Sequence, residues 1–160
     1  MSNLRVIGID PGTITCGYGI LEKDPRNNII YIDSGTLRLS RNRSLPERLE
    51  SLYNGVNRLL KEFKPREAAI EKVFFSLSIN AALGLGHARG VVLLALASEK
   101  ISIKEYSPNE VKKSVTGYGR AEKRQVQQMV KTILDLKHTP PSDSADALAL
   151  AICHLNTMRL

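Results

Sequence analysis

The sequence is poor in cysteine and contains no long hydrophobic segment, and each absence argues against a class of protein. Its two cysteines, Cys16 and Cys153, lie far apart and outside any CxxC spacing. This spacing argues against a zinc knuckle or a disulfide framework and favours a reducing environment. The longest unbroken apolar run, residues 91–97, falls far short of the roughly 18 residues that span a bilayer. We therefore expect a cytoplasmic protein with neither a membrane anchor nor an export signal.

Charge and size narrow the possibilities further. The 160 residues carry 23 basic and 16 acidic side chains, a net charge of +7 at pH 7, which favours a polyanionic partner or substrate. This indication is weak by itself, because many basic proteins bind no polyanion. An apolar content of 42% is enough for one core of ordinary size. Because the sequence has no internal repeat, low-complexity tract or linker, residues 1–160 are expected to form a single domain.

Hydrophobic periodicity predicts an α/β fold. Short β-like runs separated by turn residues indicate strands, and leucines at three- and four-residue spacing between positions 45 and 63 indicate an amphipathic helix. Ser107 and Glu110 form a capping-box pattern around Pro108, and Ser142 is expected to cap the last helix. The expected strands cover residues 5–10, 17–21, 29–39, 68–71 and 101–106, and the expected helices cover 45–63, 80–100, a short segment from 108, 126–134 and a segment after 142. This order predicts a mixed central sheet of about five strands flanked by helices.

Four acidic residues stand where a metal-dependent nuclease would need them. Asp10 and Glu71 each end an apolar strand, and Asp143 and Asp146 are three residues apart in the first turn of a helix. A carboxylate at the end of a buried strand is costly to desolvate unless a cation meets it, and Mg²⁺ and Mn²⁺ take oxygen ligands. Two such ions can activate a water molecule and stabilise the departing oxygen of a phosphodiester. The four acids therefore predict a divalent metal site.

Each acid also has a purely structural interpretation. Asp10 can simply begin the turn at the following Pro-Gly pair, and Glu71 can be an exposed residue that pairs with a neighbouring base. Acids in a first turn, such as Asp143 and Asp146, also complement the helix dipole. The combination of three separate acid-bearing segments is what favours the metal site.

Basic and aromatic residues accompany these acids. The basic clusters indicate either phosphate contacts or solvated helix faces. Phe74 and Phe75 follow the strand that ends at Glu71, so Phe74 either stacks on an unpaired base or covers the sheet, as we expect for Phe75. The basic residues are Arg38, Arg41, Arg43 and Arg48 near the first long helix, and Lys112, Lys113, Arg120, Lys123 and Arg124 around a glycine-containing break.

Several motifs occur in order over residues 5–155. They are Gly8-Ile9-Asp10-Pro11-Gly12, Gly17-Tyr18-Gly19, Ala69-Ile70-Glu71-Lys72-Val73-Phe74, Gly86-His87-Ala88-Arg89-Gly90, Ala121-Glu122-Lys123 and Asp143-Ser144-Ala145-Asp146-Ala147-Leu148-Ala149. Together they resemble the RuvC family of bacterial Holliday junction resolvases. Their joint occurrence is far more specific than any single motif.

The resemblance implies an RNase H-like fold and a homodimer that nicks two opposed strands of four-way junction DNA in recombination and repair. It implies two Mg²⁺ ions per subunit, with Mn²⁺ as a substitute, and helper proteins of the RuvA and RuvB type, a junction-binding protein and a branch-migration motor. Phe74 would stack on a base at the crossover, and Lys112 and Lys123 would lie near the scissile phosphate. The metal-binding catalytic acids would be Asp10, Glu71, Asp143 and Asp146.

The chain departs from the family pattern at three places. Leu77-Ser78 stand where a Lys-Asn pair is common, Cys16 stands where threonine is common, and Gly84 replaces a frequent lysine. The resemblance therefore does not extend to polar contacts from the segment after Phe74.

Residues 81–97 are rich in small and apolar side chains, which favours either a dimer interface or an internal core helix. Other functions share some of these features. An RNase H-like nuclease acting on RNA or an RNA:DNA hybrid would need the same acids. A sugar-kinase-like nucleotide binder would need a second such domain, and a non-catalytic junction-binding module would use the acids only to cap helices and pair with bases.

Overall fold

A five-stranded mixed sheet forms the centre of the computed structural model, which describes residues 3–73 and 78–158. The first three strands form an antiparallel meander, and the last two add in parallel on the other side of β1, giving the order β3-β2-β1-β4-β5. The strands are β1 (Leu4–Asp10), β2 (Thr15–Lys23), β3 (Ile29–Arg38), β4 (Glu67–Glu71) and β5 (Ser102–Tyr106). The expected α/β fold with a mixed five-stranded sheet is confirmed.

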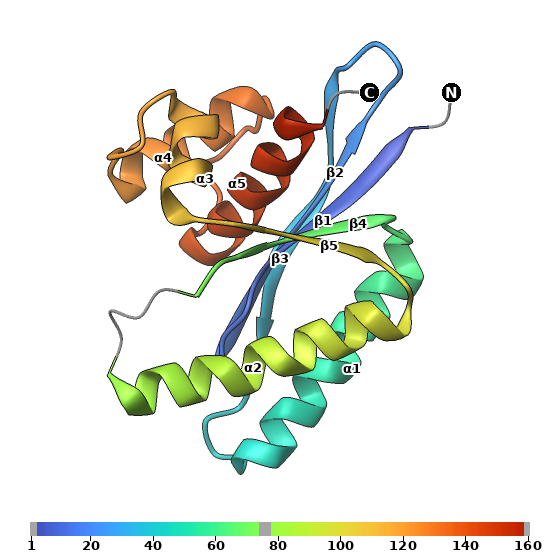
Figure 1. Cartoon of the computed structure of the whole chain (residues 1–160), viewed down its shortest axis with the longest axis vertical. Coiled ribbons are helices and arrows are strands. Elements are labelled where there is room, and N and C mark those ends of the chain that lie inside the picture. Colours follow the sequence, from blue (N-terminus) through green and yellow to red (C-terminus); the bar gives the residue numbers. More distant parts are fainter. Residues whose placement is uncertain (1–2, 74–77, 159–160) are drawn as a thin grey trace.

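Helices cover both faces of this sheet (Figure 1). The third, fourth and fifth helices pack on one face, and the first two pack on the other. Val6 on β1 faces the first group, whereas Ile7 and Ile9 face the second, and all three are buried. A strand covered on both faces needs such a continuous apolar run. The helices are α1 (Leu45–Phe63), α2 (Ile79–Ser98), α3 (Pro108–Thr116), α4 (Lys123–Ile133) and α5 (Ser142–Thr157).

Three glycines on β1 and β2 allow α5 to lie directly on the sheet. Gly8 and Gly19 are cross-strand partners, and Gly17 lies two residues before Gly19 on the same face. A Cβ atom at Gly8 would be 1.9 Å from the carbonyl oxygen of Ala147, and one at Gly17 would be 2.1 Å from that of Asp143. Only glycine permits such a close backbone approach. These three residues, the glycine patch, therefore set the position of the first turns of α5.

A buried polar network holds the other end of α5. The ring of His154 is fully enclosed; its Nδ1 lies 2.7 Å from the Tyr106 hydroxyl and its Nε2 lies 2.5 Å from the Glu67 carboxylate. The Lys23 ammonium donates a hydrogen bond of 2.8 Å to the carbonyl of Leu155. Because buried polar groups are costly unless they are paired, this network fixes the last turns of α5 against β2, β4 and β5.

Most of the helix starts follow the sequence, but that of α5 does not. Ser107 and Glu110 form the predicted capping box of α3 around Pro108. The prediction that Ser142 caps α5 is wrong, because Pro141 occupies the N-cap position and Ser142 is already helical. The fixed φ of proline suits the extended cap conformation at this position. The helix therefore begins without a side-chain cap.

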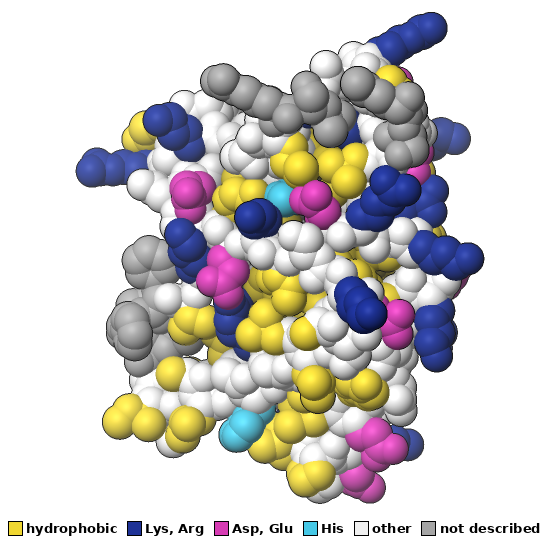
Figure 2. Space-filling view, turned by 45° about the vertical axis from the view of Figure 1, so that its right-hand side comes forward, with side chains coloured by type: hydrophobic (Ala, Val, Ile, Leu, Met, Phe, Trp, Pro, Cys, Tyr) yellow, Lys and Arg dark blue, Asp and Glu magenta, His cyan; other side chains and the backbone are white. Residues whose placement is uncertain are grey.

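Helix α2 buries only one of its sides. Ala88 and Val92 are fully buried, whereas Leu83 and Leu94 are 58% and 59% exposed. Figure 2 shows hydrophobic side chains at the surface in the lower part of the molecule, where Figure 1 places α1 and α2. By length and composition α2 could also cross a membrane, a criterion that many core helices meet as well. The helix is thus part of the core on one side and leaves an apolar face uncovered on the other.

Replacing Gly8 by alanine is expected to lower the free energy of unfolding by about 1–3 kcal/mol, because the new methyl group would force α5 away from the sheet. Urea unfolding followed by circular dichroism measures the change. Gly90→Ala is the matched control: nothing lies within 4 Å of its Cβ position on α2, so alanine should raise helix stability by up to about 1 kcal/mol. Equal stability of Gly8→Ala and the unmodified protein would contradict the close contact.

Candidate active site

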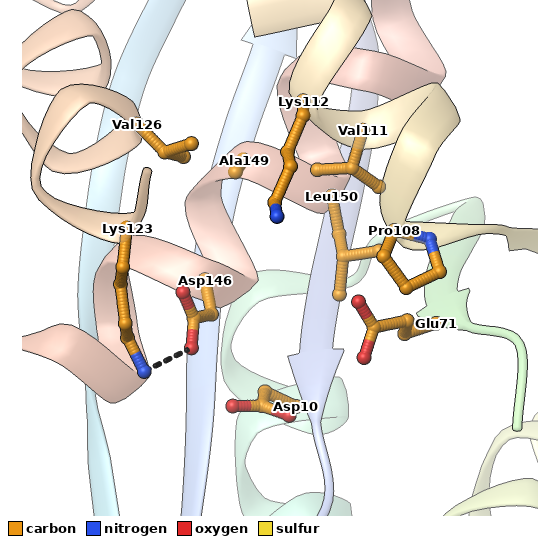
Figure 3. A pocket seen from close by; sticks show the side chains of 10 residues that line it. All are labelled: Asp10, Glu71, Pro108, Val111, Lys112, Lys123, Val126, Asp146, Ala149 and Leu150. Atoms are coloured by element: carbon orange, nitrogen blue, oxygen red, sulfur yellow. Dashed lines mark ion pairs between the residues drawn. The ribbon is translucent and has the colours of Figure 1, made fainter. Parts of the chain in front are cut away.

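Strands β1 and β4 end side by side and carry two of the predicted acids. Ile9 and Ile70 are neighbours in the parallel ladder, so the next residues, Asp10 and Glu71, stand at the same edge of the sheet. Asp146 reaches this edge from the first turns of α5. Figure 3 shows the three carboxylates around one pocket, which has a volume of about 280 Å³. Three chain segments that are distant in sequence thus bring acid to a single space.

The fourth predicted acid, Asp143, lies beside this pocket rather than in its lining. Its backbone carbonyl packs over Gly17, the cross-strand partner of Asp10. Its negative charge still acts on the pocket, because it raises the pKa values of both Asp10 and Asp146. The described structure therefore brings three of the four acids together and holds the fourth next to them.

The pocket concentrates negative charge in a partly buried space. Burial and the charges of Asp146, Glu71 and Asp143 raise the pKa of Asp10 from 3.8 to about 7. Burial also raises the pKa of Asp146, although Lys123 lowers it in part, and burial together with Asp146 raises the pKa of Glu71. Such clusters of perturbed carboxyl groups in a pocket are typical of functional sites. The carboxylates therefore repel one another in this space.

Two of the predicted basic residues line the same pocket. Lys112 enters it from α3, and Lys123 enters it from the first turn of α4 (Figure 3). The Nζ atom of Lys123 lies 3.3 Å from Oδ2 of Asp146, and its side chain is 62% exposed. An ammonium group that is both paired and accessible can also contact an incoming phosphate. The structure thus places both predicted lysines beside the acids.

Other predicted contact residues have different outcomes. Arg48 is partly buried and donates a hydrogen bond of 3.2 Å to the carbonyl of Thr13, in the turn that follows β1. Its role in this structure is to hold that turn. The side chains of Arg38, Arg41 and Arg43 are exposed. Exposure is consistent with either predicted role, contact with phosphate or a solvated surface. The predicted stacking residue Phe74 and its neighbour Phe75 lie outside the described residues.

Sequence reasoning gave no role to Arg89, although it is part of one of the family-like motifs. Its Nη1 atom donates a hydrogen bond of 2.6 Å to the backbone carbonyl of Glu71, and its Nη2 atom pairs with the carboxylate of Glu105. The charge of Arg89 also lowers the pKa of Glu71 in part. Its place in the motif could have marked Arg89 as functional. Its contact with the backbone of Glu71 could not be predicted, because that contact depends on the fold.

The donor set of the pocket fits a hard divalent cation. Asp10, Glu71 and Asp146 offer only oxygen ligands, as Mg²⁺ and Mn²⁺ prefer. Burial and mutual repulsion both raise the pKa of Asp10, and a bound cation would offset both effects. Within residues 3–73 and 78–158, however, no three acidic, histidine or cysteine side chains lie close enough together to bind one metal ion. The pocket therefore matches a divalent cation in ligand type and charge, but its side chains are not at ligand spacing.

Solved structures share this architecture. A structure of Thermus thermophilus RuvC matches with a TM-score of 0.85 and 33% identity, over 96% of this chain and 94% of that one. The T. thermophilus protein in complex with a Holliday junction substrate matches with a TM-score of 0.87 and 34% identity, over 94% and 92% of the two chains. A yeast mitochondrial Holliday junction resolvase, at 14% identity and a TM-score of 0.70, shares the fold.

Curated relatives and a family model agree with these structures. A protein described as crossover junction endodeoxyribonuclease RuvC from Legionella pneumophila is 48% identical over 149 residues, 93% of this chain and 85% of its own length. The protein of the same description from Chloroflexus aggregans is 48% identical over 155 residues, 96% of this chain and 94% of its own. The family model for crossover junction endodeoxyribonuclease RuvC matches residues 6–154.

The sheet, its helices and the acidic pocket define a nuclease of the RNase H-like class. Within that class, the chain belongs to the RuvC family of crossover junction endodeoxyribonucleases. Membership in this family implies the use of a divalent metal.

Asp10→Asn is expected to raise the free energy of unfolding at about pH 8, without metal, by about 1–3 kcal/mol after allowance for solvent screening. The raised pKa means that ionising Asp10 costs more in the folded state, and this cost grows as the pH rises from 3.8 to about 7. The difference in the free energy of unfolding between Asp10→Asn and the unmodified protein should therefore shrink as the pH falls toward about 4. Thermal unfolding with EDTA across this range measures it.

The exposed acid Asp135, outside the pocket, provides the control for this experiment. Asp135→Asn makes the same chemical change, and asparagine tolerates the left-handed backbone conformation found there. A gain for Asp10→Asn that is no larger than that of Asp135→Asn, or that does not depend on pH, would contradict the electrostatic account.

Proposed function

We propose that this protein resolves four-way DNA junctions by cutting two opposed strands in recombination and repair, through Mg²⁺-dependent hydrolysis of phosphodiester bonds. The observation that carries the proposal is the pocket itself, in which three carboxylates and two lysines meet at one edge of the sheet. Membership in the RuvC family and its likeness to a RuvC structure with a Holliday junction substrate support the choice of substrate.

Each side chain of the pocket has a chemical role in this proposal. Asp10, Glu71 and Asp146, with Asp143 beside them, are the ligands for two Mg²⁺ ions, and Mn²⁺ can take their place. When bound, such ions supply an activated water and stabilise the leaving oxygen. With water as the attacking group, no covalent enzyme intermediate is needed. Asp10 must lose its proton before it binds a cation, so binding should strengthen as the pH rises toward about 7.

The lysines act on the substrate rather than on the cations. Lys123 is paired with Asp146 and is exposed, so a phosphate that approaches the pocket meets an ammonium group already fixed beside the acids. Lys112 projects from α3 toward the same space (Figure 3). Together they offset the repulsion between the phosphate and the acids and align the scissile group. Phe74, which follows Glu71 at a distance of three residues, is proposed to stack on a base at the crossover.

The acting species is proposed to be a homodimer. A junction has two scissile phosphates related by a near two-fold axis, and a two-fold dimer with one site per subunit matches that symmetry. The uncovered apolar face of α2, with Leu83 and Leu94 exposed, is the surface that a second copy would cover. We further propose that the whole chain acts as one nuclease domain in the cytoplasm, with partners of the RuvA and RuvB type.

Asp146→Asn is expected to reduce junction cleavage by at least about a hundredfold, because it removes a metal ligand from the pocket. Junction binding should remain within about threefold, because the basic surface is unchanged and one negative charge near the phosphate is lost. Gel assays on a labelled four-way junction, with Mg²⁺ or EDTA, measure both quantities.

Linear duplex and RNA:DNA hybrid are the substrate controls for this assay. Paired nicks in the junction alone, dependent on Mg²⁺, are the expected result for the unmodified protein. Cleavage of the hybrid would instead make the protein an RNA-directed nuclease, and binding without any cleavage would make it a junction-binding module. Near-normal cleavage by Asp146→Asn would remove that residue from the proposed site.

Leu94→Arg is expected to weaken dimerisation by at least about tenfold, because it places a charge in the proposed apolar interface. Sedimentation velocity over a concentration series measures the change. Ile30→Arg is the matched control, since Ile30 is 40% exposed on β3 rather than on α2. If Leu94→Arg dimerises as well as Ile30→Arg does, α2 is not the interface.

A further inference from the structure

Arg89, in the middle of α2, joins two strand ends of the sheet. Its side chain is only 12% exposed. One arm of the guanidinium donates a hydrogen bond of 2.6 Å to the backbone carbonyl of Glu71, and the other arm pairs with the carboxylate of Glu105. A guanidinium offers several donors in a fixed planar fork, so it can hold two acceptors at once. The contact therefore fixes both acceptors relative to α2.

The two acceptors lie at neighbouring positions of the β4·β5 ladder. Glu105 pairs with Ile70, and Tyr106 pairs with Glu71. Just beyond the strand, the amide of Lys72 donates a hydrogen bond of 2.8 Å to the carbonyl of Tyr106. The end of β4 is thus held within the sheet by β5 and from the α2 face of the sheet by Arg89. Since β4 has only five residues, each of these contacts is a large share of what keeps its end from fraying.

Arg89 approaches Glu71 from the face of the sheet opposite to the pocket. Ala69 belongs to the core on the α5 face, and Ile70 belongs to the core on the α1 and α2 face. Side chains alternate along a strand, so the Glu71 side chain shares the α5 face with Ala69 and lines the pocket. Arg89 comes from α2 and is not in the pocket lining. Arg89 thus contacts the backbone of Glu71 on one face of the sheet, while the Glu71 carboxylate lies in the pocket on the other face.

We propose that Arg89 is a positioning residue for the reaction: it holds the last residue of β4 in place from behind the sheet, so that the Glu71 carboxylate keeps its position in the pocket. This inference rests on the proposed function of Glu71 as a metal ligand. Active-site groups must be held to within a fraction of an ångström, and a misplacement of about 1 Å can cost a hundredfold in rate. A backbone that frays at Glu71 would exceed that tolerance.

A merely structural role for Arg89 predicts something different. If the ion pair with Glu105 only stabilises the fold, removing it should lower the melting temperature and leave the rate of the remaining folded protein unchanged. A positioning role instead predicts a lower rate at full occupancy by substrate, with the affinity for the junction retained. The two roles are therefore separated by comparing rate, affinity and local backbone opening in one set of variants.

The test compares Arg89→Met, Arg89→Lys and Arg58→Met. Arg58 is exposed on α1, so Arg58→Met makes the same change in charge away from the strand end. Single-turnover cleavage of a four-way junction in Mg²⁺ should fall by about 10–100-fold in Arg89→Met, with junction affinity within about threefold. Arg89→Lys should recover part of the rate, because lysine keeps the charge but not the fork. Arg58→Met should cleave within about twofold of the unmodified protein.

Amide hydrogen exchange without metal or DNA supplies a measurement that does not depend on activity. The amide of Lys72, bonded to Tyr106, should exchange at least about tenfold faster in Arg89→Met, while amides in β1 should not change. Unchanged exchange at Lys72, or a cleavage rate equal to that of Arg58→Met, would overturn the proposal. If the unmodified protein cuts no junction, the proposed function fails, and with it the catalytic meaning of Arg89. Exchange at Lys72 would then still decide whether Arg89 holds the strand end.

Discussion

Helix α5 lies so close to β1 and β2 that no side chain fits between them at the glycine patch. The carbonyl oxygens of Asp143 and Ala147 occupy the space where Cβ atoms of Gly17 and Gly8 would be. This contact brings the first turns of α5 to the edge where β1 and β4 end, next to Gly17, the cross-strand partner of Asp10. The nearness of Asp146 to Asp10 follows from this close packing, and the charge of Asp146 adds to burial in raising the pKa of Asp10.

The pocket is electrostatically unfavourable by itself, and the rest of the fold offsets this cost. Two apolar cores, one on each face of the sheet, together with the network around His154, hold the elements that carry the acids. Because those elements are fixed from outside the pocket, the carboxylates remain near one another despite their repulsion. Stability given up at a functional site and recovered elsewhere is a general feature of enzymes. The same logic applies to Arg89, which acts on Glu71 from the far side of the sheet.

Much of the site could be predicted from local sequence, because its acids mark the ends of recognisable elements. The apolar run before Asp10 and the short one before Glu71 gave both strands, and the predicted α/β fold with about five strands was correct. Contacts between segments distant in sequence were harder to predict. The apolar run after Asp146 favoured a site role for it over Asp143, but the placement of Asp146 in the pocket and Asp143 beside it depends on the packing of α5 on glycines of β1 and β2. The backbone contacts of Arg48 and Arg89 were missed for the same reason, since a carbonyl acceptor leaves no trace in residue type.

The arrangement of α5 on β1 also has a consequence for how the protein is made. The two segments that face each other across the pocket are the first strand and the last helix of the chain, so a ribosome releases one long before the other. Until α5 emerges, the nascent sheet carries Asp10 and Glu71 without Asp146, and its glycine patch is uncovered. Contacts between segments so distant in sequence carry a loop-closure cost and slow the folding of a chain. The pocket is thus completed only when the fold is completed, and an unfinished chain has no assembled site with which to cut DNA.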